Sequence, residues 1–300
     1  MSPAAATSAL GLSSAVIWGV ADFSGGLAAR HLRVFWMLAI SHAFSFVCLL
    51  ALAGGLHEAA PNLHILLLGF WSGLAGGVAL LTFYHALSLG EMGITAALTG
   101  LLTAALPVVY TLMTIGRPSR RQLAGFALAA VAIWLISVQT RTEKKADPLE
   151  RTRLWLAVIS GFGFGAFLIF LRQANGGGLI WPLAASRVGS LLLAVGGGLI
   201  FSRRHFIADQ AVQPGQAVQP SRVRWQTGVW LALLASACDT GGNFFFVAAT
   251  RVGRLDVASV LASLYPASTI LLAAWLLKER TSARQAVGMT AALVAVVLIS

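Results

Sequence analysis

Two carboxylates stand inside apolar stretches of this chain, where an acidic side chain is typical of cation binding or proton exchange. Asp22 follows Trp18 by one helical turn, so an acid and an aromatic ring would share a helix face and suit an ammonium group. Asp239 and Asn243 have the same spacing in the second half of the chain. A second acid facing Asp22 would make two charges unfavourable there, which is a device for proton coupling. Both acids also have a structural interpretation, as groups that hydrogen-bond neighbouring helices.

Two phenols and an imidazole extend this set. Tyr84 and His85 close one apolar stretch, and an imidazole can exchange a proton near neutral pH. Tyr265 precedes Pro266, and a proline in a helix frees a backbone carbonyl that can line a site, as Pro107 would also do. The alternative for these residues is ordinary packing and kinking within the membrane. We predict a substrate or coupling site from Trp18, Asp22, Tyr84, His85, Asp239, Asn243 and Tyr265, with Pro107 and Pro266 as gating or kink positions.

The composition places these residues in a membrane. The chain is 58% hydrophobic and 10% charged, against roughly 25% charged residues in soluble domains. Apolar runs of about twenty residues recur, and a backbone that crosses lipid must satisfy its own hydrogen bonds. We therefore predict an all-α polytopic membrane protein whose net charge of +11 reflects loop Lys and Arg, with no nucleic-acid partner. The ten predicted spans are 9–29, 34–54, 63–87, 94–115, 122–139, 153–171, 180–201, 226–249, 256–277 and 284–300.

The second half of the chain repeats the first. The stretch RQLAGFALAAVAIWLIS (121–137) and the stretch RQAVGMTAALVAVVLIS (284–300) agree at nine of seventeen positions. We predict one five-helix repeat over 1–139, a charged linker over 140–152 and a second repeat over 153–300. Because five is odd, the second repeat would be inverted about an axis in the membrane plane. The distribution of Lys and Arg predicts that both termini lie outside the cytoplasm.

Aligning the two halves also pairs two basic residues. His42 and Arg187 occupy equivalent positions in the second helix of each half, within the motifs WMLAISHAFS and WPLAASRVGS. An inverted repeat predicts that they lie at opposite depths in the membrane. Arg187 needs an acidic partner, and Asp239 and Asp22 are the candidates, so we interpret both basic residues as structural charges.

The pattern resembles the drug/metabolite transporter superfamily, in particular its ten-helix group built from two EamA-type repeats. The resemblance is carried by Trp18-Gly19 in the first span, by the proline-bearing fourth helix of each half, and by the Arg-Gln-x-x-Gly start of each last helix. It covers nearly the whole chain. It implies alternating access around a central cavity lined by helices 1, 3, 4, 6, 8 and 9.

We therefore predict a secondary transporter of a bacterial-type inner membrane that exports a small metabolite, such as an amino acid or a similar amphipathic compound. Protons are a candidate coupling partner, and no cofactor, metal, catalytic residue or oligomer is required. One alternative is a lipid-carrier flippase of the same fold, which would use cationic contacts such as Arg187. Less favoured alternatives are a membrane-embedded enzyme, which would need clustered catalytic groups, and a sensory protein, which would need a signalling module.

Overall fold

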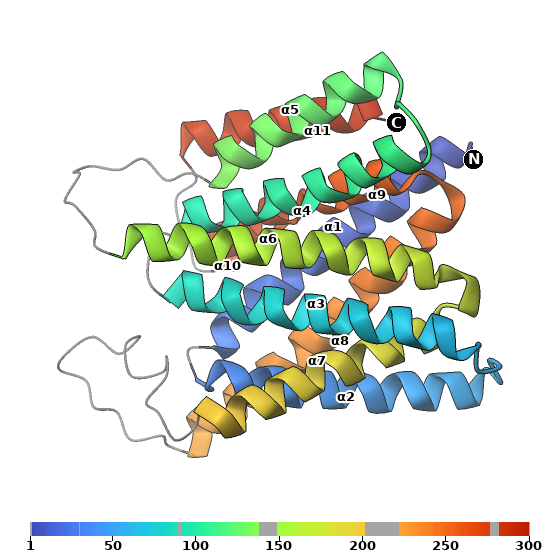
Figure 1. Cartoon of the computed structure of the whole chain (residues 1–300). Helices are drawn as coiled ribbons and strands as arrows, with labels where there is room; N and C mark the ends of the chain where they lie inside the picture. Colours follow the sequence, from blue (N-terminus) through green and yellow to red (C-terminus); the bar gives the residue numbers. More distant parts are fainter. Residues whose placement is uncertain are drawn as a thin grey trace.

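The computed structural model of the protein describes residues 2–29, 31–88, 92–137, 149–201, 222–276 and 282–299, and all regular structure within these ranges is helical. The all-α prediction is therefore confirmed. Figure 1 shows the helices packed side by side in one bundle. They are α1 (Pro3–Ala28), α2 (Val34–Gly55), α3 (Leu63–Ser88), α4 (Met92–Thr114), α5 (Arg120–Ser137), α6 (Glu150–Gln173), the short 3-10 helix η1 (Ala174–Gly177), α7 (Ile180–Phe201), α8 (Arg222–Val252), α9 (Leu255–Ala262), α10 (Tyr265–Leu276) and α11 (Ala283–Ile299).

The helices are those of a polytopic membrane protein. Six of them, α1, α2, α3, α6, α7 and α8, are long and apolar enough to cross a bilayer, and α11 and residues 98–114 of α4 are shorter apolar helices. Large apolar side chains face outward from the bundle, among them Met113 at 82% and Trp275 at 77% exposure. Such an apolar exterior suits contact with lipid. The count of ten spans stays a prediction, and residues 140–148 of the predicted linker lie outside the described ranges.

The two prolines have different effects on their helices. The predicted ninth span, 256–277, is two helices, because α9 ends at Ala262 and α10 begins at Tyr265. Pro266 lacks the N–H that would bond the Ala262 carbonyl, and its ring would collide with that carbonyl. Pro107 lies inside α4, which continues to Thr114. The expected break therefore occurs at Pro266, whereas α4 runs through Pro107.

The packing pairs have an internal correspondence. The sequence repeat equates α1 with α6, α2 with α7, α3 with α8, α4 with α9 and α10, and α5 with α11. Helix α1 packs on α8 as α6 packs on α3, and α1 contacts α9 and α10 as α6 contacts α4. The pairs α2–α7 and α5–α11 map onto themselves. In Figure 1, α1 and α6 begin at opposite ends of the bundle, as an inverted repeat would require.

A glycine stripe brings α3 against α7. A Cβ atom added at Gly73 would lie 1.8 Å from the Ser186 carbonyl oxygen, and one at Gly69 would lie 2.6 Å from the Pro182 carbonyl oxygen. Glycine is thus required at both positions for the helix backbones to approach each other. These glycines therefore pack the first half of the chain closely against the second.

Gly73→Ala is expected to destabilise the protein. The new methyl group must push α7 away or deform α3, which costs about 1–3 kcal/mol in a packed interior. Thermal unfolding of the purified protein in detergent measures the loss. Gly196→Ala in α7 is the control, because a Cβ atom there meets nothing within 4 Å. Equal unfolding midpoints for the two variants would contradict the close contact.

Candidate functional site

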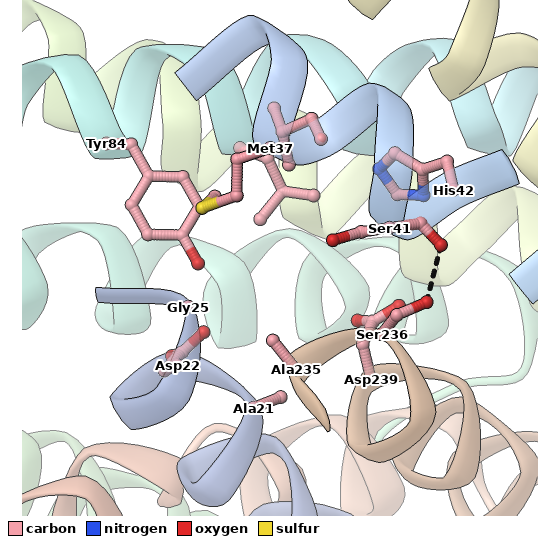
Figure 2. A pocket seen from close by; sticks show the side chains of 12 residues that line it. Ala21, Asp22, Gly25, Met37, Ser41, His42, Tyr84, Ala235, Ser236 and Asp239 are labelled. Carbon is pink, nitrogen blue, oxygen red and sulfur yellow. Dashed lines mark hydrogen bonds between the residues drawn. The ribbon is translucent and has the colours of Figure 1, made fainter. Parts of the chain in front are cut away.

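A cavity lies between α1, α2, α3 and α8, toward the end of the bundle where α1 ends and α2 begins. Figure 2 shows that its polar wall combines side chains from α1, α2, α3 and α8. The acids Asp22 and Asp239 both line it, as does Tyr84. Three residues predicted from the sequence as site candidates are thus brought together from three helices.

The cavity is narrow. It has only about 40 Å³ in which the centre of a water molecule can move. A single water needs about 10–15 Å³ by the same measure. The cavity therefore admits a few waters or one small chemical group, and a whole metabolite enters only if the helices move apart.

Asp239 is already paired. Its Oδ2 atom lies 2.7 Å from Nη2 of Arg187, and Asn243 Nδ2 donates to the same oxygen at 3.2 Å. Arg187 is 3% exposed and the Asp239 side chain is 33% exposed. The sequence offered Asp239 and Asp22 as candidate partners for Arg187, and in the structure Arg187 pairs with Asp239. The pair neutralises itself and joins α7 to α8.

Asp22 is different. Across the described residues, its carboxylate has no hydrogen-bond donor and no cationic partner. Arg30, the nearest basic residue after it in the sequence, lies outside the described ranges. Gly25, one turn further along α1, faces the Tyr84 hydroxyl, since a Cβ atom there would lie 2.5 Å from that oxygen. Among the described residues, this cavity-facing acid is thus left without a charge partner.

His42 also lines the cavity, and it touches Arg187. Its Nδ1 atom lies 3.4 Å from Nη1 of Arg187. The prediction that these two residues lie at opposite depths is therefore wrong. Helices α2 and α7 pack on each other, and the two equivalent positions meet near their crossing. Equivalent residues of an inverted repeat come together wherever they lie close to its axis.

Serine hydroxyl groups bind α2 to α8 beside the cavity. Ser236 Oγ donates to the Ser41 carbonyl oxygen at 2.5 Å, which is the dashed line in Figure 2. Ser41 Oγ donates to the Ala232 carbonyl oxygen at 3.0 Å, and Ser45 Oγ lies 2.9 Å from Thr240 Oγ1. Sequence reasoning did not place Ser41 or Ser236 at the site. The repeated serines of the WMLAISHAFS motif were the available signal.

Four other predicted site residues lie outside the cavity lining. Trp18 stacks on Phe246 with ring centroids 5.8 Å apart, and its indole nitrogen is buried with no partner in the described part of the chain. Tyr265 is buried among core side chains at the start of α10. Asn243 reaches the site through Asp239, and His85 is half-buried one residue past Tyr84.

Four helices line this cavity. Helices α1, α3 and α8 are among those that the resemblance implied, and α2 contributes as well. Helix α4 packs against α6, where Thr99 Oγ1 donates to the Ala157 carbonyl oxygen at 3.2 Å. Thr103 donates to the Thr99 carbonyl oxygen within its own helix.

The opposite end of the bundle is held by two arginines around the α8–α9 turn. Arg254 donates to Asp256 Oδ2 at 2.8 Å and to the Gly116 carbonyl oxygen at 3.0 Å, and Asp256 is fully buried. The hydrogen bonds to Asp256 raise the pKa of the Arg254 guanidinium. Arg251 donates to the Asn175 carbonyl oxygen at 3.0 Å. We call these three connections the latch; they join the segment after α4 and the helix η1 to the end of α8 and the start of α9.

The comparisons with known proteins concern the family and the fold. The model of the EamA-like transporter family matches residues 151–300. No curated protein matches the chain significantly. One solved structure, described only as a crystal structure of a protein, is similar over 99% of this chain and 96% of its own, with a TM-score of 0.73 and 13% sequence identity. At this identity the likeness concerns the fold alone.

Proposed function

The chain belongs to the EamA-like transporter family, and from its cavity we propose that it is a secondary transporter exporting a small metabolite by alternating access. The observation that carries this proposal is the charge arrangement: two acids face one cavity, and a buried arginine neutralises only one of them. The substrate is an amino acid or a similar amphipathic compound, and the membrane is a bacterial-type inner membrane.

Asp22 is the binding or coupling group in this proposal. With Asp239 balanced by Arg187, the described groups around the cavity leave one uncompensated acid. A carboxylate at membrane depth is costly, so it favours taking up one cation. That cation is either a proton or the ammonium group of the substrate. If Asp22 binds either a proton or the substrate ammonium group, but never both at once, export of the substrate is coupled to entry of a proton.

The two ends of the bundle support access from one side at a time. The cavity lies at the end opposite the latch, and that end is the predicted cytoplasmic side. A substrate loaded there would leave at the other end only after the latch separates. Inverted repeats allow this exchange, because one half can rock against the other around a fixed site.

Weakening the latch is expected to make the latch end of the bundle accessible to reagents in the water on that side of the membrane. In an Arg254→Met/Asp256→Asn variant the bond to Gly116 is lost, and no lone buried charge remains. Ser259 is fully buried in α9, so Ser259→Cys serves as a reporter after Cys48 and Cys238 are replaced by alanine. A membrane-impermeant thiol reagent added at the latch side should react about tenfold faster than in the intact latch, the effect of losing one charged hydrogen bond.

The control for this experiment is the same reporter with the latch intact. Equal reaction rates in the two backgrounds, at equal unfolding temperatures, would contradict a gating role for the latch.

The flippase alternative is not favoured by the site. It would use Arg187 to contact a lipid headgroup, but that side chain is 3% exposed and engaged by Asp239 and His42. A fluorescent-lipid scrambling assay in liposomes separates the two functions.

The export proposal is tested in cells. Metabolites in the medium are compared by mass spectrometry between cells overproducing the wild-type chain and cells overproducing the Asp22→Asn variant. The proposal expects at least one small amine or amino acid to accumulate outside only with the wild-type chain. Identical media would contradict it.

A further inference from the structure

We propose that His42 is a specificity-determining residue that donates a hydrogen bond to an uncharged acceptor, such as an amide carbonyl, on a substrate whose amine binds near Asp22. The inference rests on the proposed transport function and names its substrate class: a small monocation that also carries a hydrogen-bond acceptor. Arg187 is a positioning residue for His42, and it does not itself line the cavity.

The contact with Arg187 fixes the tautomer of His42. A guanidinium group has only donors, so the His42 Nδ1 atom at 3.4 Å must accept. A ring that accepts at Nδ1 is neutral and carries its proton on Nε2. A doubly protonated ring would place two cationic donors against each other. Arg187 thus turns His42 into a neutral donor whose N–H is on the far ring nitrogen.

That donor has no partner among the residues that the structure describes. His42 is 4% exposed, and its Nε2 atom is buried without a hydrogen-bond partner in the ranges that the structure describes. Leaving a buried N–H without an acceptor is unfavourable, so such groups are rare unless a ligand or a water molecule accepts the hydrogen bond. His42 lines the cavity, so a molecule that enters once the helices move apart is the available acceptor for this nitrogen.

The charges of the residues around the cavity indicate which class of substrate fits it. Asp22 and Asp239 contribute two negative charges and Arg187 contributes one positive charge, while His42 is neutral. One positive charge on the substrate balances this described set. A zwitterion would bring a carboxylate into a site that already holds the acidic excess, so an amine with a neutral acceptor fits better than an amino acid with a free carboxylate.

The walls and the size of the cavity agree with this class. Met37, Leu38 and Leu80 form its apolar side and can pack an aliphatic chain. The 40 Å³ open to water centres accommodates a head group before the helices separate. Leucinamide has such a head group and chain, isoamylamine lacks its amide, and leucine replaces the amide by a carboxylate.

Two substitutions at His42 separate the acceptor toward Arg187 from the donor toward the substrate, because each variant retains only one of them. The side-chain oxygen of His42→Asn replaces Nδ1 and can still accept from Arg187, but no donor reaches the Nε2 position. The amide nitrogen of His42→Gln replaces Nε2–H. Binding of leucinamide, isoamylamine and leucine to the purified full chain is measured by tryptophan fluorescence and by thermal shift, together with the unfolding temperature of each variant.

The wild-type protein is expected to bind leucinamide about tenfold more tightly than isoamylamine, the effect of one hydrogen bond to a buried donor, and more tightly than leucine. His42→Gln should keep this preference. His42→Asn should bind both amines equally while still binding isoamylamine.

Equal binding of the two amines by the wild-type protein would contradict the inference, even if a variant failed to fold. So would identical preferences in His42→Asn and His42→Gln, which indicate a structural role, or tighter binding of leucine. Absence of binding by all three probes would also overturn it, whereas the transport function is decided separately by the metabolite measurement.

Discussion

Asp22→Asn is expected to reduce transport of a cationic substrate by about 100-fold or more, because breaking a buried charge pair on one side leaves an uncompensated charge. Asparagine has nearly the same shape as aspartate, but it cannot balance a cation in a cavity of low polarity. The same substitution removes the group proposed to carry the proton. Flux measured in proteoliposomes should therefore lose both its rate and its response to a pH gradient.

The stability of Asp22→Asn provides the control. No described residue donates a hydrogen bond to Asp22 or pairs with it, so removing the charge leaves no partner unsatisfied. The unfolding temperature in detergent should stay at or above the wild-type value. Asp22→Glu retains the charge and should retain measurable flux. Wild-type flux in Asp22→Asn would contradict the role of this acid.

Asp239→Asn is expected to destabilise the protein by about 3–5 kcal/mol, because it leaves a buried guanidinium without its counter-ion. Arg187 is 3% exposed, whereas Asp239 is 33% exposed. Arg187→Met should therefore cost less, since the remaining carboxylate can reach water. The double variant should be more stable than Asp239→Asn alone.

These four proteins form a double-mutant cycle, read as thermal unfolding midpoints in one detergent. The coupling between the two substitutions is the quantity of interest. If the losses in unfolding midpoint simply add, and the double variant is no more stable than Asp239→Asn alone, the Arg187–Asp239 pair does not contribute to stability. His42 makes the cycle informative for the site too, because both single variants alter the group that orients its ring.

The helices could be predicted from the sequence because each apolar run is long enough to need an internally bonded backbone. Both acids of the cavity were also predictable, since charge at membrane depth is rare. The break before Tyr265 was indicated by Pro266, whose effect depends on the missing N–H. Pro107 shows that the same residue does not always end a helix: α4 continues beyond it.

The face of each helix could not be predicted in the same way. Lipid-facing and protein-facing surfaces are both apolar, so the sequence does not indicate that α2 turns Ser41 and His42 toward α8 and the cavity. The meeting of His42 and Arg187 depends on where α2 and α7 cross. That register is set by close contacts such as Gly73 against Ser186, which appear only in the packed structure.

The central claim is that the chain moves a small molecule through this cavity. The most direct measurement loads liposomes holding the purified protein with a mixture of amino acids, their amides and the matching amines, and follows each compound in the outside medium by mass spectrometry. We expect saturable release of at least one amine-bearing compound, faster with an opposing proton gradient and lost in Asp22→Asn. Release of every compound at the rate of protein-free liposomes would contradict it.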